Sequence, residues 1–229
     1  MIMKSLKLGL IFFLLFVSQY CYTQDWANLE RFKKDNEMVL KSDSTQQRIV
    51  FMGNSITEGW LKFRPEFFEG KPYINRGIGG QTTPQMLLRF RQDVIDLKPS
   101  VVVILAGIND IAGNTGPSTI EMIMDNLKSM SELAIANDIK VVFCSVLPAK
   151  DFPWRSGLEP ANKVIKLNTL LQSYVKKHNL VYVDYFSAMV DDSNGLKEEL
   201  GYDGVHPNAL GYSIMEPLVE KGIKIALAN

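Results

Sequence analysis

Short runs of apolar residues recur along the chain, and polar or amphipathic stretches separate them. The runs predict strands over 49–52, 73–75, 101–105, 141–146 and 181–183. The third run, Val-Val-Val-Ile-Leu, contains no polar residue, which is typical of a central strand that is covered on both faces. Strands of this kind belong to parallel sheets that are flanked by helices.

Between these runs, apolar residues return at the 3.6-residue spacing of amphipathic helices. This spacing predicts helices over 25–40, 84–97, 118–137, 160–177 and 208–227, and a further helix begins straight after Gly53. Strands that alternate with helices in this way require right-handed crossovers. The pattern therefore predicts a three-layer α/β fold with a mainly parallel sheet.

The first 23 residues differ from the rest of the chain. Lys4 and Lys7 precede the apolar segment Leu8–Val17, which is too short to cross a bilayer. A basic start followed by a short apolar core is typical of a secretory signal. We therefore predict a signal peptide over 1–23 and a secreted or periplasmic protein. Cys21 leaves a lipid anchor as a minor alternative.

The remainder, residues 24–229, shows no repeat, linker or low-complexity stretch, so we predict one domain with no membrane insertion after signal removal. The formal net charge of the chain is +0 and no basic run occurs, which argues against a nucleic-acid partner. No cluster of Cys and His indicates a metal site. Cys144, the one cysteine outside the signal, lies in an apolar run and is predicted to be buried.

The carboxyl ends of parallel strands meet at one edge of a sheet, and ligands bind there. The predicted strands end in unusual loops: Gly53-Asn-Ser55, Asn75-Arg-Gly-Ile-Gly-Gly-Gln81, Gly107-Ile-Asn-Asp110 and Leu147-Pro-Ala-Lys-Asp-Phe-Pro-Trp154. The loop Gly201-Tyr-Asp-Gly-Val-His-Pro207 could join them. We expect these segments to form one site.

Ser55 stands where a buried strand turns into a helix, a position that can expose a hydroxyl nucleophile and tolerate a nearby negative charge. A second interpretation is structural. Ser55 and Glu58 have the spacing of a capping box, in which the serine only closes the helix.

His206 is the strongest candidate for a base, because Pro207 holds it in a bent loop at a helix start. Asp203 lies three residues earlier and could accept a hydrogen from Nδ1, with Asp184 as the second choice. His178, near the end of a helix, is interpreted as a surface residue.

The glycines of Gly77-Ile-Gly-Gly80 lack the spacing of a dinucleotide or phosphate loop. They instead predict a tight loop whose N–H at Gly80 can approach a small ligand. Asn109 offers a side-chain amide to the same space, although an Asn-Asp pair after a glycine is also a common turn.

Four blocks of this sequence resemble those of the SGNH (GDSL-like) hydrolases. Gly53-Asn-Ser-Ile-Thr57 is similar to the first block, with Asn54 where the family name carries Asp. Gly79-Gly80-Gln81-Thr82, Gly107-Ile-Asn-Asp110 and Asp203-Gly-Val-His206 are similar to the others, in family order. The resemblance implies a flavodoxin-like α/β/α sandwich with a five-stranded parallel sheet.

The resemblance also implies the chemistry. Ser55 would be the nucleophile, His206 the general base and acid, and Asp203 its orienting partner, while the N–H groups of Ser55 and Gly80 and the amide of Asn109 would form an oxyanion hole. No metal or cofactor would be needed. Candidate substrate contacts are Asn54, Gln81, Trp154 and Arg155.

Together with the predicted export, the resemblance implies a serine esterase for short acyl groups. The expected substrates are acetyl esters of carbohydrates. The alternatives are a lipase- or thioesterase-type acyl hydrolase of the same family and a non-catalytic glycan-binding protein. A flavodoxin-like nucleotide or flavin binder is disfavoured by the incomplete glycine motif. Trp154 and Phe152 could contact a sugar or could instead pack their loop.

Overall fold

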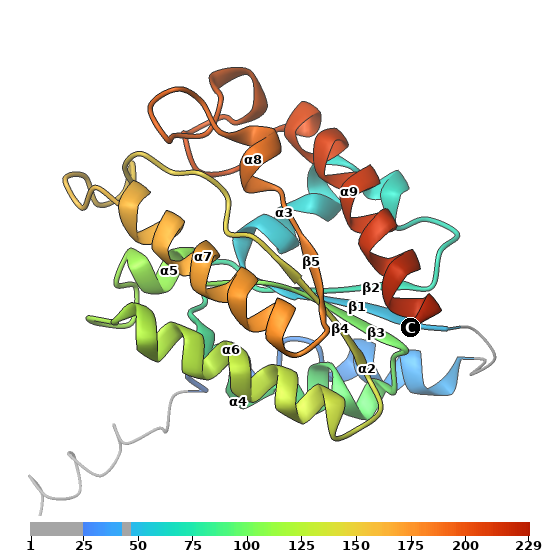
Figure 1. The fold of residues 1–229 in the computed structure, drawn as a ribbon. Helices are drawn as coiled ribbons and strands as arrows, with labels where there is room; N and C mark the ends of the chain where they lie inside the picture. The colour runs from blue at the N-terminus through green and yellow to red at the C-terminus, as the bar shows by residue number, and fades with distance from the viewer. Residues whose placement is uncertain (1–24, 43–46) are drawn as a thin grey trace, which may run out of the picture.

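The computed structural model describes residues 25–42 and 47–229. The predicted signal peptide over 1–23 lies outside the described residues. Five strands form one sheet: β1 (Ile49–Gly53), β2 (Tyr73–Gly77), β3 (Val101–Leu105), β4 (Lys140–Cys144) and β5 (Val181–Val183). All pairs are parallel and the order is β2-β1-β3-β4-β5, so the predicted five-stranded parallel sheet is confirmed (Figure 1).

The central position of β3 explains its uninterrupted apolar sequence. In the register of the sheet, Val103 lies beside Phe51 of β1 and Val142 of β4. Every residue of β1 and β3 is buried. Both faces of these strands are covered by helices, so neither face needs polar side chains.

Helices cover the sheet on both sides (Figure 1). The longer helices are α3 (Ser55–Phe63), α4 (Thr83–Asp93), α6 (Ile120–Ile135), α7 (Ala161–Lys177) and α9 (Ala209–Ala228). Strand side chains alternate between two cores. Val50 and Met52 pack in the core that contains apolar residues of α4, α6 and α7, whereas Ile49 and Phe51 pack in the core that contains those of α3 and α9.

The expected helix over 25–40 is wrong in its first half. The helix α2 spans only Lys33–Lys41, and residues 25–32 form turns. Three glutamine side chains from the region of α4 donate hydrogen bonds to carbonyls in this segment: Gln81 to Ala27, Gln85 to Trp26 and Gln92 to Leu29. These carbonyls are satisfied by side chains in and just before α4 and not by a helix of their own, which the spacing of apolar residues could not reveal.

Other boundaries also differ from the expectation. The helix predicted over 84–97 ends at Asp93 and is followed by a short 3₁₀ turn, Ile95–Leu97. The strand predicted over 141–146 ends at Cys144. The Cys144 side chain is buried as predicted, and burial raises the pKa of its thiol to about 12.

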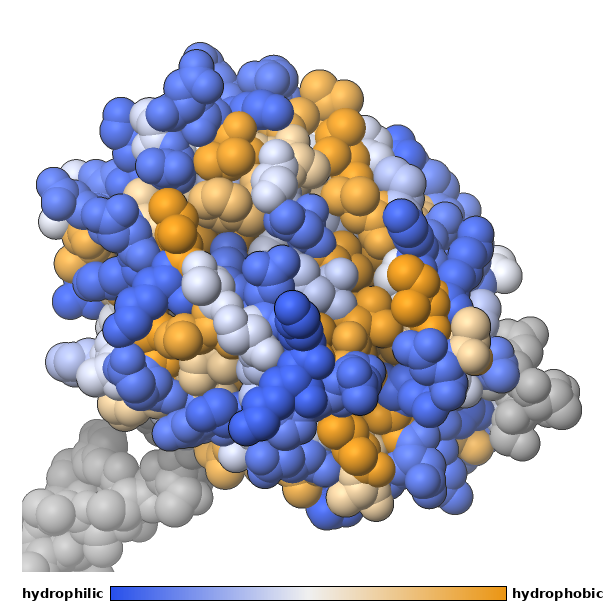
Figure 2. All heavy atoms as spheres, in the orientation of Figure 1, coloured by the Kyte–Doolittle hydropathy of each residue, from blue (hydrophilic) through white to orange (hydrophobic). Residues whose placement is uncertain are grey.

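The surface of the face drawn in Figure 2 is a mosaic of hydrophilic and hydrophobic residues, with apolar side chains in small groups. Among the described residues, no helix combines the length and the apolar character that crossing a membrane requires.

Candidate active site

Ser55 is the first residue of α3 and follows the carboxyl end of β1. Its side chain is half-buried, and its hydroxyl Oγ lies 2.9 Å from Nε2 of His206. The two residues are 151 positions apart in the chain, so only the folding of the sheet and of the 201–207 loop brings them together.

The 201–207 loop holds His206 through Asp203. Oδ2 of Asp203 lies 2.7 Å from Nδ1 of His206, and Oδ1 accepts backbone N–H groups from Val205 at 3.0 Å and His206 at 2.8 Å. Burial raises the pKa of Asp203, but these hydrogen bonds outweigh it and leave the pKa below its ordinary value. The carboxylate is therefore kept charged beside the imidazole.

The two alternative residues lie elsewhere. Asp184, the second choice as orienting partner, accepts hydrogen bonds from the backbone N–H and the hydroxyl of Ser187. His178 follows the last residue of α7, where it is exposed and packs its ring against Tyr174. Of the residues considered for the acid partner of His206, the structure brings Asp203 to it.

Ser55 and Glu58 do not form the capping box that their spacing allows. Oε2 of Glu58 instead accepts the N–H of Gly79 at 2.9 Å. This bond joins the first turn of α3 to the glycine loop 77–80. A Cβ at Gly79 would lie 3.9 Å from the Cβ of Ser55, so the loop passes directly beside the serine.

The loop residues that precede α4 meet the end of β3. Gly80 has a φ of 77° and is exposed, and its N–H has no acceptor among the described residues. Nδ2 of Asn109 donates one hydrogen to the carbonyl of Gln81 at 2.9 Å, which leaves its second N–H for another acceptor. The two predicted donors thus lie on two loops, the one before α4 and the one after β3, that are joined by this hydrogen bond; we call them the loop pair. Gly79 of the first loop lies beside Ser55.

The neighbouring Asp110 fastens this loop pair to α4. Its carboxylate accepts the N–H of Thr83 at 3.0 Å and the hydroxyl of Thr83 at 2.5 Å. Burial raises the pKa of Asp110 to about 6, against the opposing effect of the Thr83 hydrogen bonds. The sequence analysis named Asp110 only within the Gly107–Asp110 block and as part of an Asn-Asp turn, without a role of its own.

Two of the four candidate substrate contacts are buried. Asn54 is 1% exposed, and its carboxamide has no hydrogen-bond partner among the described residues. Gln81 is 3% exposed and uses its side chain on Arg89 and on the carbonyl of Ala27. Their side chains therefore face the protein interior.

Residues 51–214 match the GDSL-like Lipase/Acylhydrolase family. The chain belongs to this family. A GDSL-like lipase from Bacteroides thetaiotaomicron superposes with a TM-score of 0.85 at 46% identity, covering 88% of this chain and 99% of that one. Platelet-activating factor acetylhydrolase IB subunit alpha2 of Rattus norvegicus is 26% identical over 192 residues, which are 81% of this chain and 80% of its own. An acetylxylan esterase of Xylanibacter ruminicola is 24% identical over 77% of this chain and 43% of its own length.

In this GDSL-like acylhydrolase, the 150–157 loop carries an aromatic residue to the imidazole. Trp154 is 45% exposed, and its ring centroid lies 5.8 Å from that of His206. Phe152 is fully buried and packs against Trp154. Nη1 of Arg155 donates to the carbonyls of Ala112 and Gly113, so this residue holds the loop in place. Phe152 thus packs the loop, and Trp154 is left at the surface.

Tyr202 is a rim residue that the sequence analysis missed. It is 59% exposed, and its ring is stacked on His206 with centroids 5.6 Å apart and on Phe63 at the same separation. An aromatic residue within a Gly- and Asp-rich loop, directly before Asp203, was the available signal.

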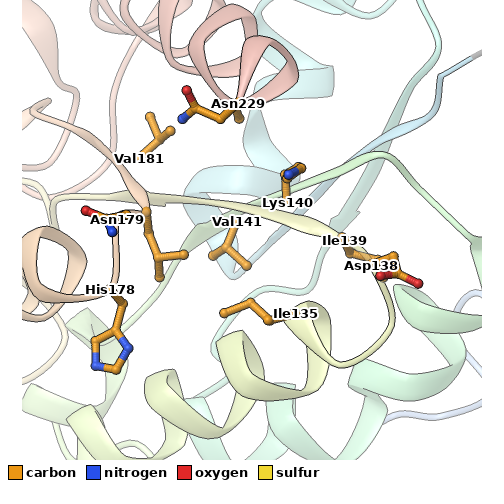
Figure 3. A pocket seen from close by; sticks show the side chains of 11 residues that line it. Ile135, Asp138, Ile139, Lys140, Val141, His178, Asn179, Val181 and Asn229 are labelled. Carbon is orange, nitrogen blue, oxygen red and sulfur yellow. The ribbon is translucent and has the colours of Figure 1, made fainter.

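Two cavities lie at opposite ends of the sheet. One, of about 720 Å³, borders Asp203, Phe152 and Pro153, and it reaches the Ser55–His206–Asp203 group at Asp203. The other, of about 400 Å³, is lined by residues at the amino ends of β4 and β5, including Lys140 and Val181 (Figure 3). Because Ser55 lies at the carboxyl ends of the strands, the second cavity is separate from the candidate active site.

Proposed function

We propose that this GDSL-like acylhydrolase is a serine esterase that removes short acyl groups, acetyl above all, from carbohydrates. The observation that carries the proposal is the 2.9 Å contact between Ser55 Oγ and His206 Nε2. A serine hydroxyl is a weak nucleophile until a base within hydrogen-bond reach takes its proton.

Asp203 selects the tautomer of His206. Its carboxylate oxygen accepts a hydrogen from Nδ1 at 2.7 Å, which leaves the lone pair of Nε2 directed at Ser55. In the first step Ser55 Oγ attacks the ester carbonyl while Nε2 takes the hydroxyl proton. The imidazolium that results is stabilised by Asp203, whose lowered pKa keeps it ionised.

The oxyanion of the tetrahedral intermediate would be bound by the N–H groups of Ser55 and Gly80 and by the amide of Asn109. One such donor typically contributes about 3 kcal/mol to the transition state. His206 then protonates the leaving alcohol, and water repeats the cycle on the acyl-enzyme. The reaction as written needs no metal or cofactor.

The acyl group is inferred from the relatives, two of which are named for removing acetyl groups. The carbohydrate is supported by the acetylxylan esterase and by the rim, where exposed Trp154 and Tyr202 contact the imidazole that protonates the leaving alcohol. Aromatic rings of this kind pack well on sugar rings. The basic and apolar start of the chain supports export through residues 1–23.

The test is hydrolysis of p-nitrophenyl acetate and of a long-chain p-nitrophenyl ester by the purified protein. We expect fast release from the acetate only, and Ser55→Ala should abolish it. Ser173→Ala is the matched control, because the Ser173 hydroxyl is exposed on α7 and, among the described residues, bonds only to the carbonyl of Thr169. Unchanged turnover in Ser55→Ala would refute the proposal.

A lipid alcohol is the second candidate, because the platelet-activating factor acetylhydrolase subunit aligns with 81% of this chain. Acetate release from acetylated xylooligosaccharides and from platelet-activating factor should be compared at equal enzyme concentration. Faster release from the lipid would favour the lipase-type alternative. Glycan binding without any acetate release would favour a non-catalytic binding protein.

A further inference from the structure

One arginine is completely enclosed beneath the candidate active site. Arg89 of α4 is 0% exposed, and four of its N–H groups have acceptors. Nε donates to Oε1 of Gln81 at 2.6 Å, Nη1 to Oδ2 of Asp93 at 3.0 Å, and Nη2 to the carbonyls of Gly53 at 3.0 Å and Arg76 at 2.9 Å.

These acceptors belong to the segments that carry the reacting groups. Gly53 is the last residue of β1, two positions before Ser55. Arg76 directly precedes the glycine loop 77–80. Gln81 follows Gly80, and its carbonyl accepts the amide of Asn109. The guanidinium thus connects the serine, the glycine loop and the asparagine from one point.

The chemistry of the contacts requires an arginine. A guanidinium presents five donors in a rigid plane, whereas a lysine ammonium has three donors on a flexible stem. The buried charge of Arg89 is paired with Asp93, which is also 0% exposed and accepts a further hydrogen bond from Asn36. A buried pair of this kind costs desolvation and contributes little to stability, so its presence calls for another reason.

We infer that Arg89 is a positioning residue, which sets the distance between Ser55 and the donors Gly80 and Asn109. It does not touch substrate, because it is fully buried. The expected effect of Arg89 on kcat rests on the proposed function, whereas its effect on the loop conformation does not. Arg89 and Asp93 stand four residues apart on α4, and Met86 and Phe90 of the same helix are also fully buried.

The oxyanion donors act on the transition state, so their displacement should lower kcat and leave KM nearly unchanged. A misplacement of about 1 Å can cost about a hundredfold in rate. For Arg89→Lys we therefore expect kcat for p-nitrophenyl acetate to fall between about tenfold and a hundredfold, with KM within about twofold.

Arg48→Lys is the matched control. Arg48 directly precedes β1 at the opposite end of the strand, is 9% exposed, and donates to the carbonyls of Leu97, Val39 and Ser42. It should lose stability as Arg89→Lys does but keep kcat within about twofold. An equal fall of kcat in the two variants would overturn the inference, because the effect would then reflect general loss of structure.

Gln81→Leu keeps the arginine and removes one of its contacts, so it tests the inference even if Arg89→Lys fails to fold. It should lower kcat in the same direction, and the double variant should lose less than the product of the single effects. If the fall in kcat of the double variant equals the product of the two single falls, the two residues act independently, and the inference that Arg89 acts through Gln81 is contradicted.

Amide hydrogen exchange measures positioning without turnover. In Arg89→Lys the hydrogen-bonded amides of Gly79, Gln81 and Thr82 should exchange at least about tenfold faster than in Arg48→Lys, because the loop loses its anchor. Equal exchange in both variants would overturn the inference. If wild-type protein hydrolyses no ester, the proposed function fails, while the exchange rates still decide whether Arg89 fixes the loop.

Discussion

Replacement of Asp203 by asparagine gives the sharpest test of the proposed catalytic group. The Asn Oδ1 can keep the backbone N–H groups of Val205 and His206, which lie 3.0 Å and 2.8 Å from Oδ1 of Asp203, so the loop should keep its conformation. The other oxygen, 2.7 Å from Nδ1 of His206, becomes an NH₂ group that can only donate.

The consequence follows from the two nitrogens of the imidazole. Facing a donor, Nδ1 must be the unprotonated nitrogen, and Nε2 then carries the hydrogen that points to Ser55. A protonated Nε2 cannot accept the hydroxyl proton. In a serine protease the same substitution lowers kcat by about 10⁴, which corresponds to about 5.5 kcal/mol in the activation free energy. We expect a loss of that order here.

The assay is the steady-state kcat for p-nitrophenyl acetate, corrected for spontaneous hydrolysis, with thermal unfolding as the check on stability. Asp184→Asn is the control, because Asp184 contacts Ser187 and should leave kcat within about twofold. A kcat of Asp203→Asn within tenfold of wild type, or an equal loss in Asp184→Asn, would refute the assignment of Asp203.

Three further predictions concern stability and specificity. Burial raises the pKa of Asp110 to about 6 from 3.8, so the folded state holds this proton more tightly than the unfolded state, and stability should fall by about 3 kcal/mol as pH rises from about 4 to about 6. Asp110→Asn should remove this part of the slope in urea unfolding, and an unaltered slope would contradict the reasoning. Trp154→Ala and Tyr202→Ala should each raise KM for acetylated xylooligosaccharides about fivefold, since an aromatic contact is worth about 1 kcal/mol, but should leave p-nitrophenyl acetate almost unaffected; equal effects on both substrates would exclude a sugar contact. Gly107→Ala should destabilise by about 2–5 kcal/mol, because its φ is 119° and a Cβ would lie 2.7 Å from buried Leu167. At Gly157, with a φ of 87°, an added Cβ would have no atom of the described residues within 4 Å. Gly157→Ala should therefore cost only the backbone strain of about 1–2 kcal/mol, and equal thermal shifts in the two variants would argue against a packing contribution at Gly107.

The layer architecture was predictable because it depends on local patterns. A strand buried on both faces has to be apolar throughout, and the runs at 101–105 and 181–183 coincide with β3 and β5. The helix over 161–177 is equally clear from its spacing. These patterns depend on which residues are buried, and buried positions can be recognised in the sequence by the spacing of apolar residues.

The N-terminal segment shows where local patterns fail. Trp26, Leu29 and Phe32 have helical spacing, yet residues 25–32 form turns because glutamines near and within α4 bind their carbonyls. A donor 54 to 63 positions away is invisible to a window of neighbouring residues. The burial of Asn54 and Gln81 is hidden for the same reason.

The sequence by itself determined the five strands, the helices between them and the set of polar residues at the strand ends. It also named Ser55, His206 and Asp203 as candidates, because their residue types and their places beside strand or helix ends are local properties. Only the tertiary structure decided that Ser55 meets His206, that Asp203 and not Asp184 holds the imidazole, and that Arg89 lies beneath them. Contacts across 151 positions depend on the strand order β2-β1-β3-β4-β5 and on side-chain packing, and neither leaves a trace in local periodicity.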